Sequence, residues 1–318
     1  MKKRPHNQGA ILIISLWVLA LLSILAVGLA YRLSLELRLA DYDLGRLNLF
    51  YLAQAGLRQA SALLLQDDAE IDSLRDAWAE SSDPDQPTPF GEGTFFLVIE
   101  DEFSRPNLNV ADSETLLRIP GMEESVVLSL RAWRGDQDLS PSQLDQEEAY
   151  YRSLNRPIER ERKPFQSLEE LTLVRGMTPS LYETLQARFT VYGPGKINLN
   201  TVSRETWVFL GLEDSLARAI LLYRTGEDGE EGTEDDHLFH TVSDLTDETL
   251  LETLGLSTDQ RLALVNFVTK YQGILTVQSN HFRVRCKAVS KNGITKEVVA
   301  VLQRVPEGLP VIKYWHED

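Results

Sequence analysis

Residues 10–30 read AILIISLWVLALLSILAVGLA, a run of 21 residues without a charged side chain. At about 1.5 Å per residue, a helix of this length crosses the roughly 30 Å hydrocarbon core of a bilayer. The nonapeptide before it, MKKRPHNQG, carries the cations Lys2, Lys3 and Arg4. Basic residues favour the cytoplasmic side of a membrane, so we expect the chain after Tyr31 to lie across the membrane.

Helical character continues beyond this apolar run. Residues 32–67 contain no proline, and apolar side chains recur there at spacings of three and four. This periodicity predicts one stem helix of about 55 residues, whose first half faces lipid and whose second half is amphipathic. The amphipathic stripe needs a cover, and we expect a sheet to provide it. The stripe consists of Leu49, Leu52, Ala53, Gly56, Leu57, Ala60 and Leu64.

Three segments have the composition and alternation of β-strands. GTFFLVIED at 93–101 is rich in aromatic and β-branched residues, and HFRVRCKAVS at 281–290 alternates apolar with basic side chains. KEVVAVLQRV follows after Asn292-Gly293, a strong hairpin signal. These strands predict a small antiparallel sheet on the stem, with the chain between them as an insertion. Cys286, the single cysteine, is expected to be a buried apolar residue. SSDPDQPTP at 81–89 is predicted to be a loop.

The insertion contains an internal repeat. PNLNVADSETLLRIPGM from Pro106 matches INLNTVSRETWVFLGL from Ile197, and a second helical pair follows each copy. The pattern of helix, glycine turn and helix occurs twice, as in helix-hairpin-helix elements. The Asn-Leu-Asn triplets are interpreted as helix caps, and Arg131 is expected to correspond to Arg218 or a residue near it.

Helix-hairpin-helix turns often bind DNA phosphates, which makes DNA binding the competing hypothesis. Here Glu123 and Glu124 follow the first glycine turn, and Glu213 and Asp214 follow its counterpart. These charges repel phosphate, so the turns are interpreted as packing elements. The formal net charge of −16 over 318 residues likewise argues against a nucleic acid partner.

The most chemically distinctive segment is GEDGEEGTEDD at 226–236. Carboxylates packed this densely between glycines repel one another unless a hard cation gathers them, and Ca²⁺ takes six to eight oxygen ligands from such flexible loops. The expected ligands are Asp228, Glu230, Glu231, Asp235 and Asp236. The alternative interpretation is a solvated acidic loop between two helices.

A second, weaker Ca²⁺ site is predicted at the equivalent place in the first repeat, with Asp136, Asp138 and Glu147 as ligands. His237 and His240 have a spacing that zinc can use, but no cysteine lies near them and oxygen donors surround them, which disfavours zinc. No nucleophile elbow, Ser/His/Asp arrangement or phosphate-binding glycine loop stands out, so no catalytic activity is expected.

The short basic leader that ends in Gly9, followed by a helix that continues as an anchor, resembles the class III signal of type IV pilins and type II secretion pseudopilins. The resemblance implies cleavage between Gly9 and Ala10 by a prepilin peptidase, with N-methylation of the new terminus. The fifth mature residue of that family is usually Glu, whereas here it is Ile14. This departure is typical of the minor pseudopilin K (general secretion pathway protein K) family.

Further motifs resemble that family in the same order along the chain: YLAQAGLRQA, GTFFLVIEDE before PNLN, FQSLEELTLVRGM, KINLNT and GEDGEEGTEDD. SQLDQEEAYY at 142–151 departs from the expected turn, which weakens the first-repeat cation site. The resemblance implies an α+β pseudopilin fold, in which a long transmembrane helix packs on a small antiparallel sheet and a large all-α domain of helix-hairpin-helix/SAM-like repeats is inserted.

The expected segments follow from this fold. They are the leader (1–9), the transmembrane half of the helix (10–31), the stem and first strand (32–103), the inserted domain (104–275, with repeats at about 106–190 and 197–275) and the C-terminal strands (276–318).

The resemblance also implies a function. The protein would sit at the pseudopilus tip, prime assembly and cap the filament for export of folded proteins across the outer membrane. The implied partners are the minor pseudopilins I and J, the major pseudopilin and the prepilin peptidase. The implied location is the bacterial inner membrane, single-pass, with a cytoplasmic N-terminus and a periplasmic globular part. The alternative is a membrane-anchored periplasmic helix-hairpin-helix protein of the DNA-uptake type.

Overall fold

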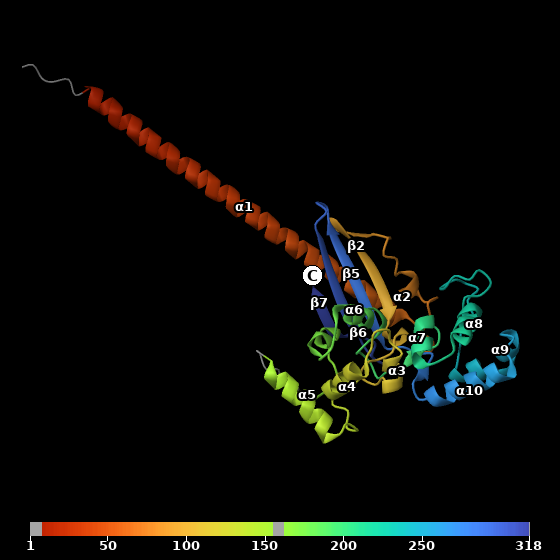
Figure 1. Cartoon of the computed structure of the whole chain (residues 1–318). Coiled ribbons are helices and arrows are strands. Elements are labelled where there is room, and N and C mark those ends of the chain that lie inside the picture. The colour runs from red at the N-terminus through yellow and green to blue at the C-terminus, as the bar shows by residue number, and fades with distance from the viewer. Residues whose placement is uncertain (1–7, 155–161, 318) are drawn as a thin grey trace, which may run out of the picture.

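The fold is built on one very long helix. The structure is a computed structural model that describes residues 8–154 and 162–317. Helix α1 (Gln8–Gln66) has 59 residues and projects as a single rod from the globular part (Figure 1). Its most apolar 18-residue window has a mean hydropathy of 2.8 and is not buried at all. Within the described ranges, this is the one helix long and apolar enough to cross a membrane. The predicted stem helix is confirmed.

The C-terminal half of α1 packs on a five-stranded antiparallel sheet of order β1-β2-β5-β6-β7. The three strands expected from the sequence are present. The strands are β1 (Thr88–Phe90), β2 (Gly93–Asp101), β5 (His281–Ser290), β6 (Thr295–Gln303) and β7 (Val311–Glu317). The sheet joins segments far apart in the chain, because β2 pairs with β5 in a register that places Leu97 opposite Cys286.

Two edge strands were not predicted. The end of the segment expected to be a loop, 81–89, enters β1, because a turn at Gly91 (φ +57°) folds Phe90 back onto Gly93. Strand β7 pairs with β6 across a register shift between Val301 and Leu302. Its side chains are exposed or only half-buried, so it lacks the apolar alternation by which buried strands are recognised.

A close approach between helix and sheet explains one glycine in the stem. A Cβ atom on Gly56 would lie 2.3 Å from Sγ of Cys286 and 3.1 Å from the Phe95 ring. Cys286 is fully buried, as expected, and burial raises the pKa of its thiol to about 12. The thiol is therefore a packing group held out of water.

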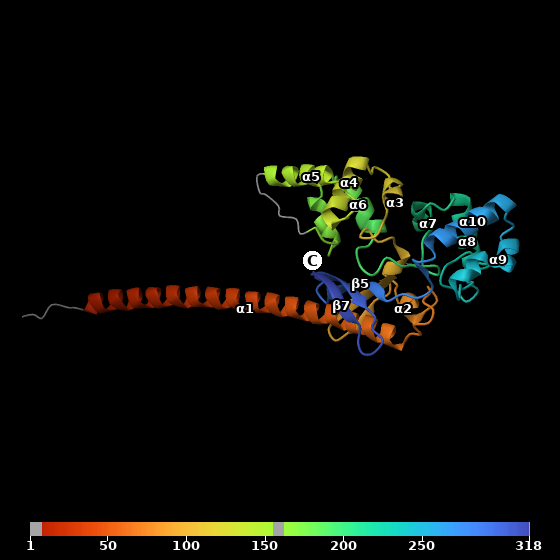
Figure 2. The same ribbon diagram turned by 90° about the horizontal axis from the view of Figure 1, so that it is seen from below.

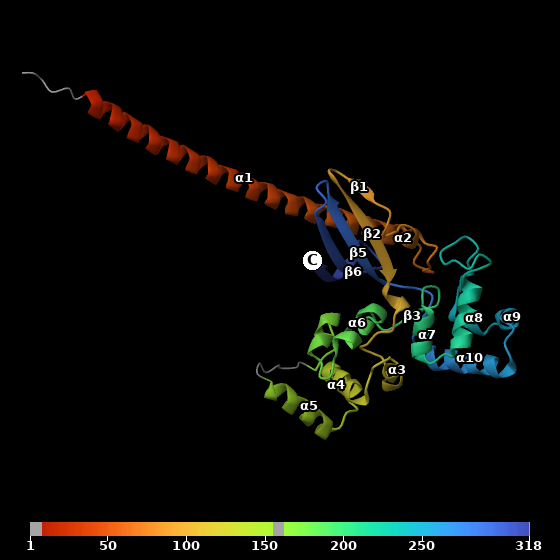
Figure 3. The same ribbon diagram turned by 45° about the horizontal axis from the view of Figure 1, so that its top comes forward.

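The chain between β2 and β5 forms the helical insertion. Figure 2 shows α4, α5 and α6 on the side of the sheet opposite to α1, and Figure 3 shows α7 to α10 as a separate group. A short 3₁₀ helix, η1 (Glu102–Ser104), leads into it, and α2 (Ala77–Glu80) precedes the sheet. The first group has α3 (Ser113–Leu117), α4 (Glu124–Arg134), α5 (Pro141–Ser153), η2 (Leu168–Leu173) and α6 (Pro179–Arg188). The second has α7 (Arg204–Leu210), α8 (Asp214–Arg224), η3 (Val242–Thr246), α9 (Glu248–Thr253) and α10 (Thr258–Tyr271).

Each group closes on itself through a short parallel pairing of its first and last residues. Asn107 pairs with Thr190, and β3 (Ile197–Asn198) pairs with β4 (Leu275–Thr276). Each group also has its own hydrophobic core, one around Leu116 and the other around the fully buried Trp207. The two groups therefore bury largely separate sets of apolar side chains, except that Phe209 of α7 packs into the core of the first group against Phe189.

The Asn-Leu-Asn triplets are not helix caps, contrary to expectation. The caps are Asp112 and Ser203, further along the chain. Instead, Asn109 donates to the Phe165 carbonyl at 3.0 Å and accepts from the Phe165 amide at 2.7 Å. Its counterpart Asn200 makes the same two bonds with Phe239, at 3.0 and 2.8 Å. Each asparagine holds the start of the second helical pair against the first. Its side-chain amide does so by pairing with both the N–H and the carbonyl of one phenylalanine.

The equivalent arginines also differ from the expected pair. Arg134 and Arg224 each end the second helix of their group and donate to the carbonyl of the central leucine of the triplet, Leu108 or Leu199. Arg131 and Arg218 make no corresponding contacts: Arg131 bonds to acidic residues after α4, whereas Arg218 pairs with Asp214 inside α8. The expected match was wrong because side-chain type alone does not fix the register of two helices.

Candidate functional site

A buried polar junction joins the insertion to the pilin-like part, which consists of α1, α2 and the five-stranded sheet. Asp101, the last residue of β2, is 3% exposed, and its Oδ2 accepts hydrogen bonds from Thr201 Oγ1 (2.5 Å), Ser279 Oγ (2.6 Å) and Asn198 Nδ2 (3.1 Å). The same Asn198 amide donates to the carbonyl of Asp72 at 3.0 Å. Chain segments from the end of β2, the loop after α1, the insertion and the start of β5 therefore meet around one carboxylate.

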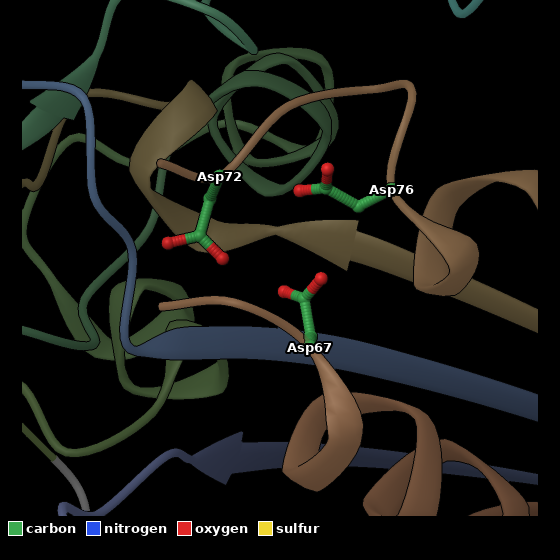
Figure 4. A group of neighbouring side chains, drawn as sticks. All are labelled: Asp67, Asp72 and Asp76. Carbon is green, nitrogen blue, oxygen red and sulfur yellow. The ribbon is translucent and has the colours of Figure 1, made fainter. Parts of the chain in front are cut away.

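Three more carboxylates converge beside this junction. Asp67 follows the end of α1, Asp72 lies in the next loop and Asp76 precedes α2, and Figure 4 shows their carboxylates pointing toward one another. One oxygen of each lies within 4.8 Å of the others. Among residues 8–154 and 162–317, this is the one such group of three potential ligands. Nothing in the sequence marks this group, because the three side chains are separated by ordinary loop residues.

A guanidinium already takes the place that a cation would have there. Arg304, after β6, donates from Nη1 to Asp72 at 2.7 Å and from Nη2 to Asp67 at 2.6 Å. Oδ2 of Asp72 accepts from the Ser279 amide at 2.6 Å, and Asp76 accepts from its own turn and from Trp78 Nε1 at 3.2 Å. Because these oxygens have protein donors, the cluster is a structural ion network rather than a metal site.

The acidic loop at 226–236 is closed by its own aspartates. Asp235 Oδ1 accepts from the Thr233 hydroxyl at 2.7 Å, and Oδ2 accepts from the amides of Asp228 (3.1 Å) and Glu227 (2.7 Å). These three hydrogen bonds lower the pKa of Asp235 to about 2. Asp236 Oδ2 accepts from the Gly232 amide at 2.7 Å. The loop thus wraps around two aspartate side chains whose remaining lone pairs are available to a cation.

The predicted Ca²⁺ ligands have the right chemistry, but their oxygens do not point to one common position. All are hard oxygen donors, and Gly226, Gly229 and Gly232 adopt positive φ, which gives the loop tight turns. Glu231, however, pairs with Arg224, and Asp228 accepts from the Glu230 amide at 2.8 Å. Within the described chain, the five expected ligands do not form a group of three converging oxygens. A bound cation would have to draw them together.

The carboxylates of the predicted first-repeat site are paired with arginines. Asp136 accepts from both Arg131 and Arg134, at 2.9 and 2.6 Å, and Asp138 pairs with Arg131 as well. Glu147 is 2% exposed and accepts from Arg175 at 3.2 Å. Arginine side chains thus pair with all three carboxylates, and the second Ca²⁺ site stays a prediction that a bound cation would have to realise in competition with these ion pairs.

The hairpin turns are poor phosphate sites, as the sequence indicated. Helix α4 begins after Glu123 and α8 after Glu213, and neither residue caps its helix with a side chain. Acidic Glu124 and Asp214 occupy the first turns. This charge arrangement does not favour the DNA-uptake alternative.

The predicted processing and assembly residues lie at the start of α1. Gly9 and Ala10 are in its first turns, and the leader residues 1–7 lie outside the described residues. Ile14 is helical and 62% exposed, on the part of α1 that contacts nothing else in the described chain. The helix therefore places an apolar side chain, and no carboxylate, one turn after Ala10.

Comparisons with known proteins agree with this architecture. A family model described as PilX N-terminal matches residues 8–58, and the model of type II secretion system protein K matches residues 123–194. No curated protein sequence matches the chain. A chain in the crystal structure of the GspK–GspI–GspJ complex from the enterotoxigenic Escherichia coli type 2 secretion system has a TM-score of 0.65 and 17% identity. The match covers 88% of this chain and 99% of that one.

The rod-like apolar helix on an antiparallel sheet, with the match at residues 8–58, is similar to the arrangement of pilin-like proteins, and the helix is long and apolar enough to cross a membrane. Residues 123–194 are similar to protein K of the type II secretion system, and the fold is shared with a chain of a GspK–GspI–GspJ complex, which agrees with the resemblance seen in the sequence.

Proposed function

We propose that the protein sits at the tip of a type II secretion pseudopilus, where it primes assembly and caps the filament for export of folded proteins across the outer membrane. The observation that carries the proposal is the apolar Ile14 at a position where assembling pseudopilins usually have Glu. Without that carboxylate, the chain has nothing to neutralise the terminal ammonium of a subunit above it in lipid, where an unpaired charge is costly.

The shape of the molecule supports a terminal position. The insertion occupies the side of the sheet opposite to α1 and extends beyond the membrane-distal end of α1 (Figures 1 and 2). A subunit stacked above would have to avoid this mass. The insertion therefore adds a steric reason for the filament to end at this subunit.

The stem offers a surface for neighbouring subunits below. Leu33, Leu37, Leu44, Leu47 and Tyr51 are between 48% and 66% exposed. Their spacing places them on one face of α1, away from the face that packs on the sheet. Such a stripe suits the helices of other pseudopilins, and the minor pseudopilins I and J are the proposed partners, as in the complex whose chain shares this fold. The major pseudopilin would follow below them.

The same proposal includes maturation and location. A prepilin peptidase would cut between Gly9 and Ala10, and the new terminus would be N-methylated. The basic residues of the leader and the apolar window of α1 support an inner-membrane, single-pass arrangement with the globular part in the periplasm. Mass spectrometry of the mature N-terminus tests this step, because recovery of the intact leader would contradict it.

Calcium is the proposed cofactor of the acidic loop. Asp235 and Asp236 already fix the loop at both ends, so Ca²⁺ bound by the second oxygens of these residues, with Asp228, Glu230 and Glu231, would reduce repulsion among the carboxylates. The support is the hard-donor set and the closed loop.

The tip position can be tested with two matched variants. Ile14→Glu restores the carboxylate, and Ile13→Glu places the same charge one residue earlier, at a similarly exposed position. Immunogold labelling of overproduced pseudopili should show the Ile14→Glu protein along filaments, whereas wild type and Ile13→Glu remain at ends. Unchanged end labelling of Ile14→Glu would refute the charge argument. Failure of pseudopilins I and J to copurify with the full chain from membranes would refute the partnership.

A further inference from the structure

The junction beside the end of α1 contains more negative than positive charge. Asp67, Asp72 and Asp76 converge on one side, with Asp101 next to them and one guanidinium, that of Arg304, among them. Asp72 is fully buried and Arg304 is nearly so. Buried like charges at this spacing repel strongly unless a proton neutralises one of them.

Asp72 is the central member of this cluster, because it bonds to the insertion, to the segment before β5 and to Arg304 after β6. Its carboxylate accepts from Arg304 Nη1 and from the Ser279 amide. Its amide donates to the Val277 carbonyl at 2.9 Å, and its carbonyl accepts from Asn198 Nδ2. The loop after α1 is thereby tied to β3 and to the segment that leads from β4 into β5.

We propose that this junction is a proton-operated latch: with Asp72 protonated it fixes the second helical group to the stem, and with Asp72 ionised it loosens. In the protonated form, Asp72 donates to the carboxylate of Asp67, while Arg304 still bridges both residues. In the ionised form, Asp67, Asp72, Asp76 and Asp101 share the single charge of Arg304.

The pKa directions agree with this geometry. Burial and, to a smaller extent, the charge of Asp101 raise the pKa of Asp72 from 3.8 to about 7, in spite of the opposing effects of Arg304 and the Ser279 amide. Burial and the charge of Asp76 also raise the pKa of Asp67. A carboxyl group with a raised folded-state pKa stabilises the closed form below its unfolded pKa, and that stability is lost as the pH rises toward 7. The latch is thus tighter at low pH. An ordinary salt bridge of aspartate has the opposite pH dependence, because it weakens at low pH.

Hydrogen exchange on the full chain in detergent micelles tests the latch. Peptides covering 71–76, 197–201 and 276–281 are compared at pH 5.5 and 7.5, after correction for intrinsic exchange. With a pKa of 3.8 in the open form and about 7 in the closed form, the opening constant should rise by up to roughly twentyfold between these pH values. Peptides from the remote helix α10 serve as an internal reference.

Two variants separate the latch from a general effect of charge. Asp72→Asn mimics the protonated side chain, so its opening constant should stay the same at both pH values and lie below that of wild type at pH 7.5. Glu70→Gln removes one exposed charge two residues away and should keep the wild-type pH dependence. Faster exchange of Asp72→Asn at both pH values, or a wild-type junction that does not respond to pH, would overturn the proposal.

If Asp72→Asn does not fold, Asp67→Asn provides the second test. It removes a negative charge next to Asp72 and keeps Asp72 itself titratable. The junction of the variant should therefore loosen at a lower pH than the junction of the wild-type protein. Equal midpoints in the two proteins would contradict the shared-proton arrangement.

Discussion

Arg224 is the side chain whose loss should most directly loosen the acidic loop. It is 3% exposed, and Nη1 donates to the carbonyls of Leu199 at 3.1 Å and Val202 at 2.8 Å, while Nη2 pairs with Glu231. Replacing Arg224 by Met keeps an apolar stem of similar length and removes the donors. Two buried carbonyls lose a partner, at about 1–3 kcal/mol each. Glu231 is 41% exposed, so loss of its ion pair adds about 1 kcal/mol or less.

These contributions predict that Arg224→Met lowers the opening free energy of the second helical group by about 2–7 kcal/mol. Native-state hydrogen exchange of peptides from α8 and from 226–236 measures it. The matched control is Arg218→Met, because Arg218 is exposed, lies in the same helix and pairs with Asp214 on the surface of that helix. A change below about 1 kcal/mol for Arg224→Met, or an equal change for the control, would refute the assigned role of Arg224.

Three further results are expected. Restoring Ca²⁺ to chelator-treated protein should raise the melting temperature, by the equivalent of about 2.7 kcal/mol at a hundredfold excess of Ca²⁺ over Kd. Asp235→Asn should reduce this gain, and identical melting temperatures with and without Ca²⁺ would contradict the site. Gly56→Ala should destabilise the stem–sheet contact by about 1–3 kcal/mol, because the added Cβ would lie 2.3 Å from Sγ of Cys286. The control Gly45→Ala has open space around its Cβ and should stabilise α1 by about 1 kcal/mol. Equal melting temperatures of the two variants would contradict the prediction. Cys286, with a thiol pKa raised to about 12, should react with a maleimide at pH 8 only after unfolding in urea, and rapid labelling of the native chain would contradict its burial.

Local patterns predicted the part of the fold in which each residue's environment depends on its neighbours in sequence. The apolar run from Ala10 and the spacing of three and four after it are sufficient for α1. Period-two alternation identified β2, β5 and β6, and Asn292-Gly293 marked the hairpin between the last two. Cys286 followed from its place on the apolar side of that alternation.

The polar contacts could not be predicted in the same way, because they join residues far apart in sequence. Asp72 meets Ser279 and Arg304 from the other end of the chain, and nothing near Asp72 signals that pairing. The duplicated Asn-Leu-Asn triplet was a usable signal, since each copy holds a phenylalanine of its own group. Its meaning was missed because asparagine also caps helices, and only the positions of the helices separate the two roles.

The two helical groups are attached to the pilin-like part in different ways, which bears on how a tip protein could respond to its surroundings. The first group touches the outer face of the sheet through surface-accessible groups, such as the 2.7 Å hydrogen bond from the Tyr314 hydroxyl to Glu169. The second group is tied through Asp72 and Asp101, where neither carboxylate reaches water. Exposed bonds exchange with solvent at little cost, whereas a buried charged network is tight or loose according to its protonation. A proton or a cation should therefore act mainly on the second group, whereas the first group is bound to the sheet by exposed contacts whose ionisation costs little.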